Sequence, residues 1–313
     1  MLSILETLFP VFALIFSGFA CRRRALLGPA AASEINAFVV WLALPALLFE
    51  SMAHTSWRQL YQPGFTAAFA LACGAVFFVT LMARLRGGRH LADASIDAIG
   101  ASYPNVGYVG FPLCLIVFGK DSLVPTTIAT FIVVCVLFAT AIMAIEASLQ
   151  GEKSLGRLAG KVALSLLRNP LILAPAAGMM VAGAHITVPG FLETFIKLLA
   201  EAASPCALVS LGLFLAEKRP AGDSARDSLL LTAGKLVLQP VLTWWLAAWV
   251  FSLPTALVEI AVLLAALPTG TGPYMLAEFY RREARITSQT ILLSTVGSVV
   301  TLSVILLYIG PKG

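Results

Sequence analysis

Long runs of apolar residues alternate with short charged clusters along almost the whole chain. Cutting the chain at these clusters leaves ten uncharged runs. A helix needs about 20 apolar residues to cross the hydrocarbon core of a bilayer. The pattern therefore predicts an all-α integral membrane protein with ten transmembrane helices and no soluble domain. The runs are 7–21, 35–49, 59–83, 98–119, 122–145, 169–192, 202–216, 236–258, 260–277 and 286–311.

Two of these runs carry helix-breaking residues at their centre. The fourth run contains PNVGYVGFP at 104–112, and the ninth contains ALPTGTGPY at 266–274. Proline lacks an N–H and clashes with the preceding helical turn. In lipid an interrupted helix survives only where it is buried in protein or lines a cavity. We therefore expect helices 4 and 9 to be broken, and to cross each other near the middle of the membrane.

Prolines recur at a nearly constant spacing between the two halves of the chain. Pro10 matches Pro175 and Pro104 matches Pro268, and the two offsets differ by a single position. Two homologous halves explain this spacing, and each half holds five spans. Because five is odd, the halves cross the membrane in opposite directions, which is the inverted-repeat arrangement of many secondary transporters. The predicted halves are 1–150 for spans 1 to 5 and 165–313 for spans 6 to 10.

Composition and charge agree with a membrane location. The chain is 59% hydrophobic and 12% charged, whereas about 25% of the residues in a soluble domain are charged. The net charge of +5 comes from loops rather than from a nucleic-acid-binding surface. By the positive-inside rule, the loops richest in Lys and Arg are cytoplasmic. Sixteen of the 21 Lys and Arg residues lie in the loops near 22–24, 84–89, 153–168, 218–226 and 281–285.

This charge distribution predicts the topology and the location of the protein. Both termini are expected on the extracytoplasmic side of a multi-pass protein in the cell (inner) membrane. The first apolar run is not a signal peptide, because Glu6 precedes it and arginines follow it, the reverse of the required order.

The apolar runs hold none of the residue sets that intramembrane enzymes use. Paired aspartates, a Ser–His pair or a His-rich set are not visible, and the five cysteines have no metal-type spacing. We therefore expect no catalytic residue, no metal site and no cofactor.

The two breaks themselves suggest a chemistry. Each break begins a second half-helix whose first N–H groups lack partners and carry the positive end of the helix dipole. Asn105 is a favourable N-cap residue, and Gly272–Pro273 suits the cap and first position of the other half-helix. Thr269 and Thr271 add hydroxyl groups. Two such N-termini facing one cavity predict a site for an anion, typically a carboxylate. The alternative is that the breaks only kink the helices for packing.

Neighbouring residues extend the candidate site. The two flanking tyrosines either line the site or pack against another helix. The lysine in the eighth span is functional by default, unless it reaches the interface. The candidate substrate-binding residues are Tyr103, Pro104, Asn105, Gly107, Lys235, Pro268, Thr269, Gly270, Thr271, Gly272 and Tyr274.

Carboxylates are scarce around the two breaks. The nearest, Asp97 and Glu278, fall at the predicted cytoplasmic ends of their spans. A sodium site inside a membrane protein combines exposed carbonyls with carboxylate, amide or hydroxyl oxygens. We therefore expect transport that does not require sodium.

Several segments of this chain resemble the signature regions of the auxin efflux carrier family. The resemblance extends over the whole chain in length, span count and short loops. The segments are PNVGYVGFPLCLIVFG at 104–119, GKLVLQP at 234–240, ALPTGTGPYMLAEFY at 266–280 and SQTILLSTVGSVVTL at 288–302.

The resemblance implies a fold akin to that of the bile-acid symporters. It implies a scaffold of spans 1, 2, 6 and 7, and a moving transport domain of spans 3–5 and 8–10 that crosses at the two breaks. Pro104 and Asn105 match the first crossover of the family and Pro268 matches the second. Members commonly have a second Asn where this chain has Gly272, so Thr269, Thr271 or bare backbone would act in its place.

The predicted function follows from the breaks and the resemblance together. Bacterial members of the family are linked to organic acids such as malate or malonate, and plant members export auxin. We expect a secondary active carrier of small organic anions such as carboxylates that works by elevator-type alternating access. A membrane channel or a substrate sensor on the same fold is the alternative. The expected partners are the anion and the lipid bilayer but no nucleic acid, and a homodimer through the scaffold is left open.

Overall fold

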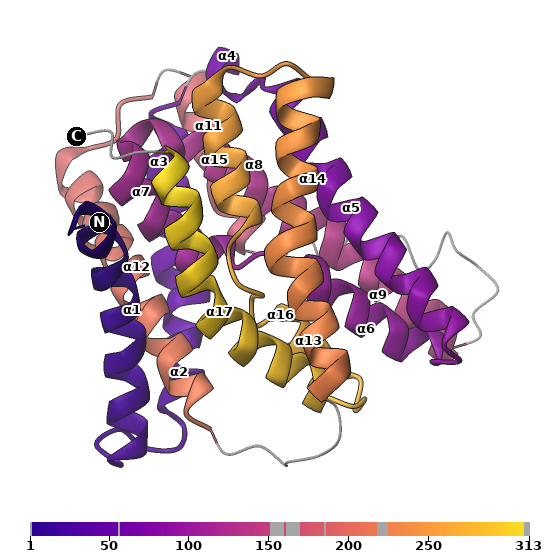
Figure 1. Ribbon diagram of the computed structural model, residues 1–313. Helices are drawn as coiled ribbons and strands as arrows, with labels where there is room; N and C mark the ends of the chain where they lie inside the picture. The colour runs from indigo at the N-terminus through magenta and orange to yellow at the C-terminus, as the bar shows by residue number, and fades with distance from the viewer. Residues whose placement is uncertain are drawn as a thin grey trace.

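The computed structural model describes residues 2–55, 57–150, 160, 170–184, 186–217 and 225–309, and these residues form helices and short connections. The described residues form no strand, and an isolated antiparallel bridge joins Pro104 to Thr269. The helices (Figure 1) are α1 (Leu2–Arg23), α2 (Ala31–Phe38), α3 (Leu44–Ala53), α4 (Trp57–Leu60), α5 (Pro63–Arg86), α6 (Leu91–Ser102), α7 (Phe111–Phe118), α8 (Leu123–Phe131), α9 (Phe138–Gln150), α11 (Pro170–Gly183), α12 (Gly190–Leu215), α13 (Ala225–Ala233), α14 (Gln239–Trp245), α15 (Thr255–Ala265), α16 (Gly272–Phe279) and α17 (Arg285–Ile309). Short π-helical or 3₁₀ stretches lie at Val39–Ala43, Val106–Gly110, Gly119–Ser122, Ile132–Leu137, Gly234–Leu238 and Leu246–Val250.

Six of the described helical stretches are long and apolar enough to cross a membrane. One of them, Val106–Leu149, contains 44 residues, about twice the length of a single crossing. Gly119, with φ of 68°, ends α7 inside this stretch. The prediction of an all-helical, multi-pass membrane protein is thereby confirmed. The six stretches are Ala31–Ala53, Pro63–Arg86, Val106–Leu149, Gly190–Leu215, Ala225–Val250 and Arg285–Ile309, and two shorter apolar helices are Pro170–Gly183 and Thr255–Ala265.

Some of the features predicted from the sequence lie outside the described residues. They include the basic residues between 153 and 168, Lys218 and Arg219. The predicted boundary between the two halves, at 150–165, falls largely in the same gap.

Four segments of helix pack closely together through small residues. Helix α1 lies along α12, α11 lies along α3, and α12 also packs on α3. A Cβ atom added to Gly18 of α1 would lie 2.1 Å from the carbonyl oxygen of Val209, and one added to Gly212 would lie 1.9 Å from that of Ile15. Gly178 allows the same close approach between α11 and α3. Glycine is required at these contacts, as is common where membrane helices approach closely.

The remaining long helices form a second packed group around α6. Helix α6 contacts α5, α9, α16 and α17, and α14 contacts α5 and α15. Ion pairs tie one end of this group together. Arg84 Nε lies 2.7 Å from Asp97 Oδ2 and Arg84 Nη1 lies 2.9 Å from Asp227 Oδ1. Arg89 Nη1 lies 3.3 Å from Glu283 Oε2, so segments far apart in the sequence share this end.

Candidate functional site

The first of the two predicted breaks comprises Tyr103–Asn105, between α6 and the π-helical turn Val106–Gly110. We call it the first interruption. Asn105 is the cap residue of that turn, and its Oδ1 accepts a hydrogen bond from Tyr108 N at 3.3 Å. Only 4% of Asn105 is exposed, and its Nδ2 has no hydrogen-bond partner. The amide thus caps the turn with its oxygen and keeps two buried donors unused.

The second interruption comprises residues 266–271, between α15 and α16. Helix α16 begins at Gly272, with Thr271 as the cap residue, which is one residue earlier than the start at Pro273 expected from the sequence. The Thr271 side chain forms no capping hydrogen bond. Proline is accommodated in this first turn because the N–H it lacks would have no partner there.

The hydroxyl of Thr269 is engaged within the protein. Thr269 is fully buried, and its Oγ1 donates to the carbonyl oxygen of Gly100 in α6 at 2.9 Å. Its backbone N donates to Ser294 Oγ of α17 at 3.0 Å. Thr269 therefore fastens the second interruption to α6 and α17, instead of offering a free hydroxyl to a ligand.

Reciprocal backbone hydrogen bonds join the two interruptions where they cross. Asn105 N donates to Pro268 O at 2.8 Å, and Gly270 N donates to Tyr103 O at 3.0 Å. These bonds flank the antiparallel bridge, so exchanging the two segments maps one bond onto the other. Across the bridge Pro104 lies opposite Thr269, Asn105 opposite Pro268 and Tyr103 opposite Gly270.

The ring of Tyr103 fills the space where side chains of the second interruption would lie. A Cβ atom on Gly270 would lie 2.8 Å from Tyr103 Cε1, and one on Gly272 would lie 3.0 Å from Tyr103 Cζ. The ring of Phe138 lies beside Tyr103, with the ring centroids 6.0 Å apart. Tyr103 thus packs between helices, and its ring explains why both positions are glycine.

The crossing also contacts α3 and α12, which belong to the closely packed set α1, α3, α11 and α12, and the neighbouring α2. Tyr274 of α16 meets Phe214 of α12 edge-on, with ring centroids 5.0 Å apart. Tyr108 donates a hydrogen bond from its hydroxyl to Asn36 Oδ1 of α2. A Cβ atom on Gly107 would lie 3.6 Å from a leucine side chain of α3, an ordinary contact. The crossing is therefore held from α2, α3 and α12 by side-chain contacts.

Lys235 lies beside the crossing in a fully buried position. Its Nζ donates to the carbonyl oxygen of Ala265, the last residue of α15, at 2.6 Å. One turn along the same helix, Gln239 Nε2 donates to the carbonyl oxygen of Ser102, the last residue of α6, at 3.1 Å. The sequence reasoning singled out the lysine but missed Gln239. A lone amide in an apolar run was the signal that could have revealed it.

A cavity of about 820 Å³ opens between α3 and α12 on one side and α7 and α8 on the other. None of the described candidate residues lines it. Its wall carries charges of both signs, and Glu193 and Lys197 of α12 face it from one helix. The acidic and basic side chains in its lining are Glu50, His54, Lys120, Asp121, Glu193, Lys197 and Glu201.

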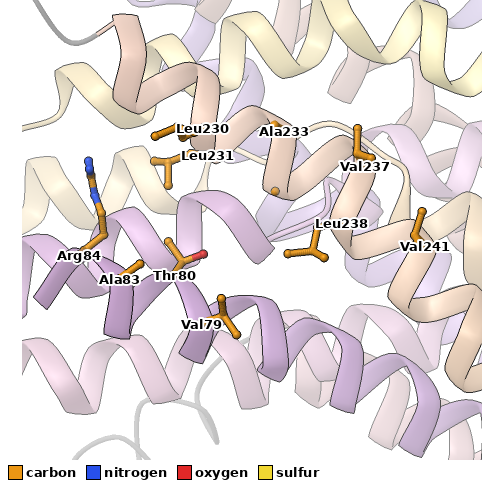
Figure 2. A pocket seen from close by; sticks show the side chains of 11 residues that line it. Val79, Thr80, Ala83, Arg84, Leu230, Leu231, Ala233, Val237, Leu238 and Val241 are labelled. Atoms are coloured by element: carbon orange, nitrogen blue, oxygen red, sulfur yellow. The ribbon is translucent and has the colours of Figure 1, made fainter. Parts of the chain in front are cut away.

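A second hollow, of about 590 Å³, lies between α5 and the helical run α13–α14 (Figure 2). Its lining is almost entirely aliphatic, with Arg84 at one end. Arg84 is already bound by Asp97 and Asp227. Val79, Leu230 and other lining side chains are exposed, so this hollow opens on the surface of the protein. The described residues contain no group of three or more His, Cys, Asp or Glu side chains placed to hold a metal ion.

Comparison with known proteins adds to this geometry. Residues 3–306 match a protein-family model described as membrane transport protein. A protein of Rhizobium meliloti (strain 1021) named “Putative malonate transporter” is 30% identical over 295 residues, which cover 94% of this chain and 92% of the relative. The “Uncharacterized transporter YfdV” of Escherichia coli (strain K12) is 24% identical over 301 residues, 94% of each chain. “Auxin efflux carrier component 3a” of Oryza sativa subsp. japonica is 26% identical over 147 residues, 46% of this chain and 23% of the relative.

Proposed function

This chain belongs to the auxin efflux carrier family of membrane transport proteins, and we propose that it is a secondary active carrier of small organic anions, with carboxylates as its substrates. It is a transport protein and not an enzyme. The name of the Rhizobium meliloti relative makes malonate the first anion to test. The substrate binds where the two interrupted segments cross.

The observation that carries this proposal is the unused amide of Asn105. A buried donor without a partner costs about 1–3 kcal/mol, so it persists where a ligand supplies the acceptor. Asn105 Nδ2 is such a donor, and it lies at the start of the turn Val106–Gly110. The positive end of a helix and an amide donor together favour a carboxylate.

The proposed architecture is a ten-helix protein made of two inverted five-helix repeats, 1–150 and 165–313, in which spans 4 and 9 are broken. The two interruptions, Tyr103–Asn105 and 266–271, support it, because each lies between two helices and they meet at one bridge. The helix pairs α1 with α12 and α11 with α3 support it too. In the proposed repeat α1 is span 1, α12 is span 7, α11 is span 6 and α3 belongs to span 2. The repeat relates span 1 to span 6 and span 2 to span 7, so it exchanges these two helix pairs.

The carrier is proposed to move as two bodies. The scaffold is the group α1, α2–α3, α11 and α12, and the transport domain is the rest of spans 3–5 and 8–10. The 820 Å³ cavity supports this division because it lies between α3 and α12 of one body and α7 and α8 of the other. Sliding of the transport domain would carry the crossing across the membrane, as in other carriers with inverted repeats. Assembly as a homodimer through the scaffold stays a prediction.

The protein is proposed to lie in the cell (inner) membrane with both termini extracytoplasmic. The ion pairs support one shared basic side, because Arg84 reaches the start of α13 and Arg89 reaches the segment before α17. In Figure 1, α1 begins and α17 ends away from the turn between α1 and α2. Single cysteines replacing the exposed Leu26 and Tyr61, in a cysteine-free background, should react with an impermeant maleimide from opposite sides. Labelling of both from one side would contradict this orientation.

A binding screen of the purified protein tests the proposed substrate class. Acetate, malonate and succinate are compared with glucose and methylammonium in thermal unfolding. A specific ligand raises the unfolding temperature because it binds the folded state, and at least one carboxylate should do so. Stabilisation by glucose or methylammonium alone would contradict the proposal. In proteoliposomes the same carboxylate should show saturable counterflow, whereas unsaturable conductance would indicate a channel.

A further inference from the structure

The helical run Ala225–Val250 places two polar side chains deep inside the protein. Lys235 and Gln239 are both fully buried. They are four residues apart, so they lie on the same face of the helix. A buried ammonium in a membrane protein is costly and marks a functional position by default.

Lys235 binds the end of the helix that leads into the second interruption. Its Nζ donates to the carbonyl oxygen of Ala265 at 2.6 Å, where α15 ends. The carbonyl groups of a last helical turn lack intrahelical partners and carry the negative end of the helix dipole. The ammonium therefore occupies a place where the backbone itself attracts a cation.

Gln239 binds the end of the helix that leads into the first interruption. Its Nε2 donates to the carbonyl oxygen of Ser102, where α6 ends, and to Cys73 Sγ, both at 3.1 Å. Its Oε1 is buried and has no hydrogen-bond partner. One helix face thus supplies hydrogen-bond donors to the ends of both helices that enter the crossing. The Oε1 atom of Gln239 on this face is an acceptor without a partner.

No carboxylate neutralises Lys235 within the part of the chain that the structure describes. The ion pairs found there use arginines and one histidine, and none includes Lys235. The anion proposed to bind at Asn105 would supply the missing negative charge. Lys235 therefore has a cation's place at the crossing but no counter-ion among the described residues.

We propose that Lys235 is a tethered cation that takes the place of a free coupling ion in the transport site. Carriers with interrupted helices hold sodium ions on half-helix C-terminal ends and unwound carbonyls near the substrate. Here the Nζ atom occupies such a position permanently and adds its positive charge to the site of the bound anion. The inference rests on the proposed anion site, and it gives a physical reason for transport without sodium.

The test removes the tethered charge and offers free cations instead. Lys235→Ala deletes the ammonium and leaves space beside the carbonyl oxygen of Ala265. Malonate affinity is measured by calorimetry in choline, sodium and ethylammonium chloride. The wild-type affinity should be the same in all three salts within about two-fold. The Lys235→Ala affinity should fall at least about ten-fold in choline and recover in sodium or ethylammonium.

Two control variants separate charge from packing. Lys235→Met fills the space without a charge, so it should bind malonate weakly in every salt. Lys197→Ala removes an exposed lysine from the 820 Å³ cavity, and it should show no cation dependence. A sodium requirement of the wild type, or a Lys235→Ala variant that no cation rescues, would overturn the proposal.

Thermal unfolding in the same salts needs no carboxylate. It therefore tests the cation site at Lys235 independently of the proposed anion transport. Sodium or ethylammonium should raise the unfolding temperature of Lys235→Ala above its value in choline, and neither should do so for Lys235→Met. A Lys235→Ala protein that stays unfolded in all three salts would overturn the proposal as well. Wild-type protein that binds no carboxylate, beside a cation-stabilised Lys235→Ala variant, would refute the anion site but support the cation site.

Discussion

The two segments that cross have equivalent backbone hydrogen bonds but different side chains. Tyr103–Asn105 and Pro268–Gly270 exchange equivalent hydrogen bonds around one bridge. The first segment carries a tyrosine ring and an amide, and its amide keeps a donor unused. The second carries a threonine whose hydroxyl is engaged and a glycine that leaves room for the ring.

The crossing therefore combines paired backbone bonds with a side-chain donor on one segment only. In the register of the bridge Asn105 lies opposite Pro268 and Tyr103 opposite Gly270, so only the first segment offers a side-chain amide there. The second segment contributes closely approaching backbone and a fixed position. We therefore assign recognition of the anion to the first segment and maintenance of the geometry to the second, a comparison that substitutions can test.

Replacing Asn105 by Ala should have the largest effect. The loss of a hydrogen bond to a charged ligand costs roughly 1.5–3 kcal/mol, or about ten- to a hundred-fold in affinity. Loss of the cap on Tyr108 N should also lower stability by about 1 kcal/mol. Calorimetric titration with malonate measures the first effect and thermal unfolding the second.

Asn36→Ala is the matched control for this variant. It removes the partner of the Tyr108 hydroxyl but leaves the amide of Asn105 in place. It should lower stability with little change in malonate affinity. If Asn105→Ala behaved in the same way, the role of Asn105 would be structural and the anion site would lie elsewhere.

Replacing Gly270 by Ala tests the second segment. The added methyl group would lie 2.8 Å from the Tyr103 ring and 3.4 Å from Asn105 Cα. Overpacking of this kind costs about 1–3 kcal/mol, so the unfolding temperature should fall. Gly107→Ala is the control, because its methyl group meets only an ordinary contact at 3.6 Å.

A double variant identifies the cause of the Gly270→Ala effect. Trimming the ring with Tyr103→Leu should make Gly270→Ala less harmful than it is beside the tyrosine, which a double-mutant cycle measures. Additive effects of the two substitutions would show that the ring is not what requires glycine at this position.

Replacing Thr269 by Val should have a smaller effect. It removes the hydroxyl that donates to Gly100 O while keeping the shape, and a typical hydrogen bond contributes about 0.5–1.5 kcal/mol. Thr271→Val, where the side chain forms no capping bond, should change stability by less than about 0.5 kcal/mol. Equal losses for the two threonines would contradict the distinction between a fastened and a free hydroxyl.

The smallest expected effect concerns an ion pair far from the crossing, between α6 and the turn that follows α16. Arg282 Nε donates to Asp93 Oδ1 at 2.8 Å, and this guanidinium holds the pKa of Asp93 below its ordinary value. Because the folded pKa lies below the unfolded one, the pair stabilises the protein above the unfolded pKa, near 4. That contribution is lost as pH falls through the folded pKa.

Thermal unfolding between pH 7 and pH 3 measures this contribution. A partly exposed pair is worth about 0.2–1 kcal/mol, so Asp93→Asn should lower stability slightly at pH 7 and less at pH 3. Arg282→Gln should reproduce this pH profile, because it breaks the same pair. A constant difference from the wild type at every pH would show that the ion pair is not its source.

The sequence by itself determined the features that depend on local pattern. Uncharged runs between basic clusters predicted a multi-pass helical protein, and the signature segments predicted its family; both predictions are confirmed. Proline, asparagine and glycine around Pro104 and Pro268 predicted breaks in two spans, and α6 ends at Ser102 and α15 at Ala265 beside them. These signals are readable because a missing N–H or a side-chain cap acts within a few residues of its own position.

Only the tertiary structure decided which groups meet across the molecule. It set the register in which Asn105 lies opposite Pro268 and Tyr103 opposite Gly270, and it engaged the hydroxyl of Thr269 with the distant Gly100. It also placed the Lys235 ammonium on the end of α15. No local pattern encodes such pairings, because a hydrogen bond between distant segments depends on how whole helices pack. The chemistry of the crossing therefore emerged only when the two halves of the chain came together.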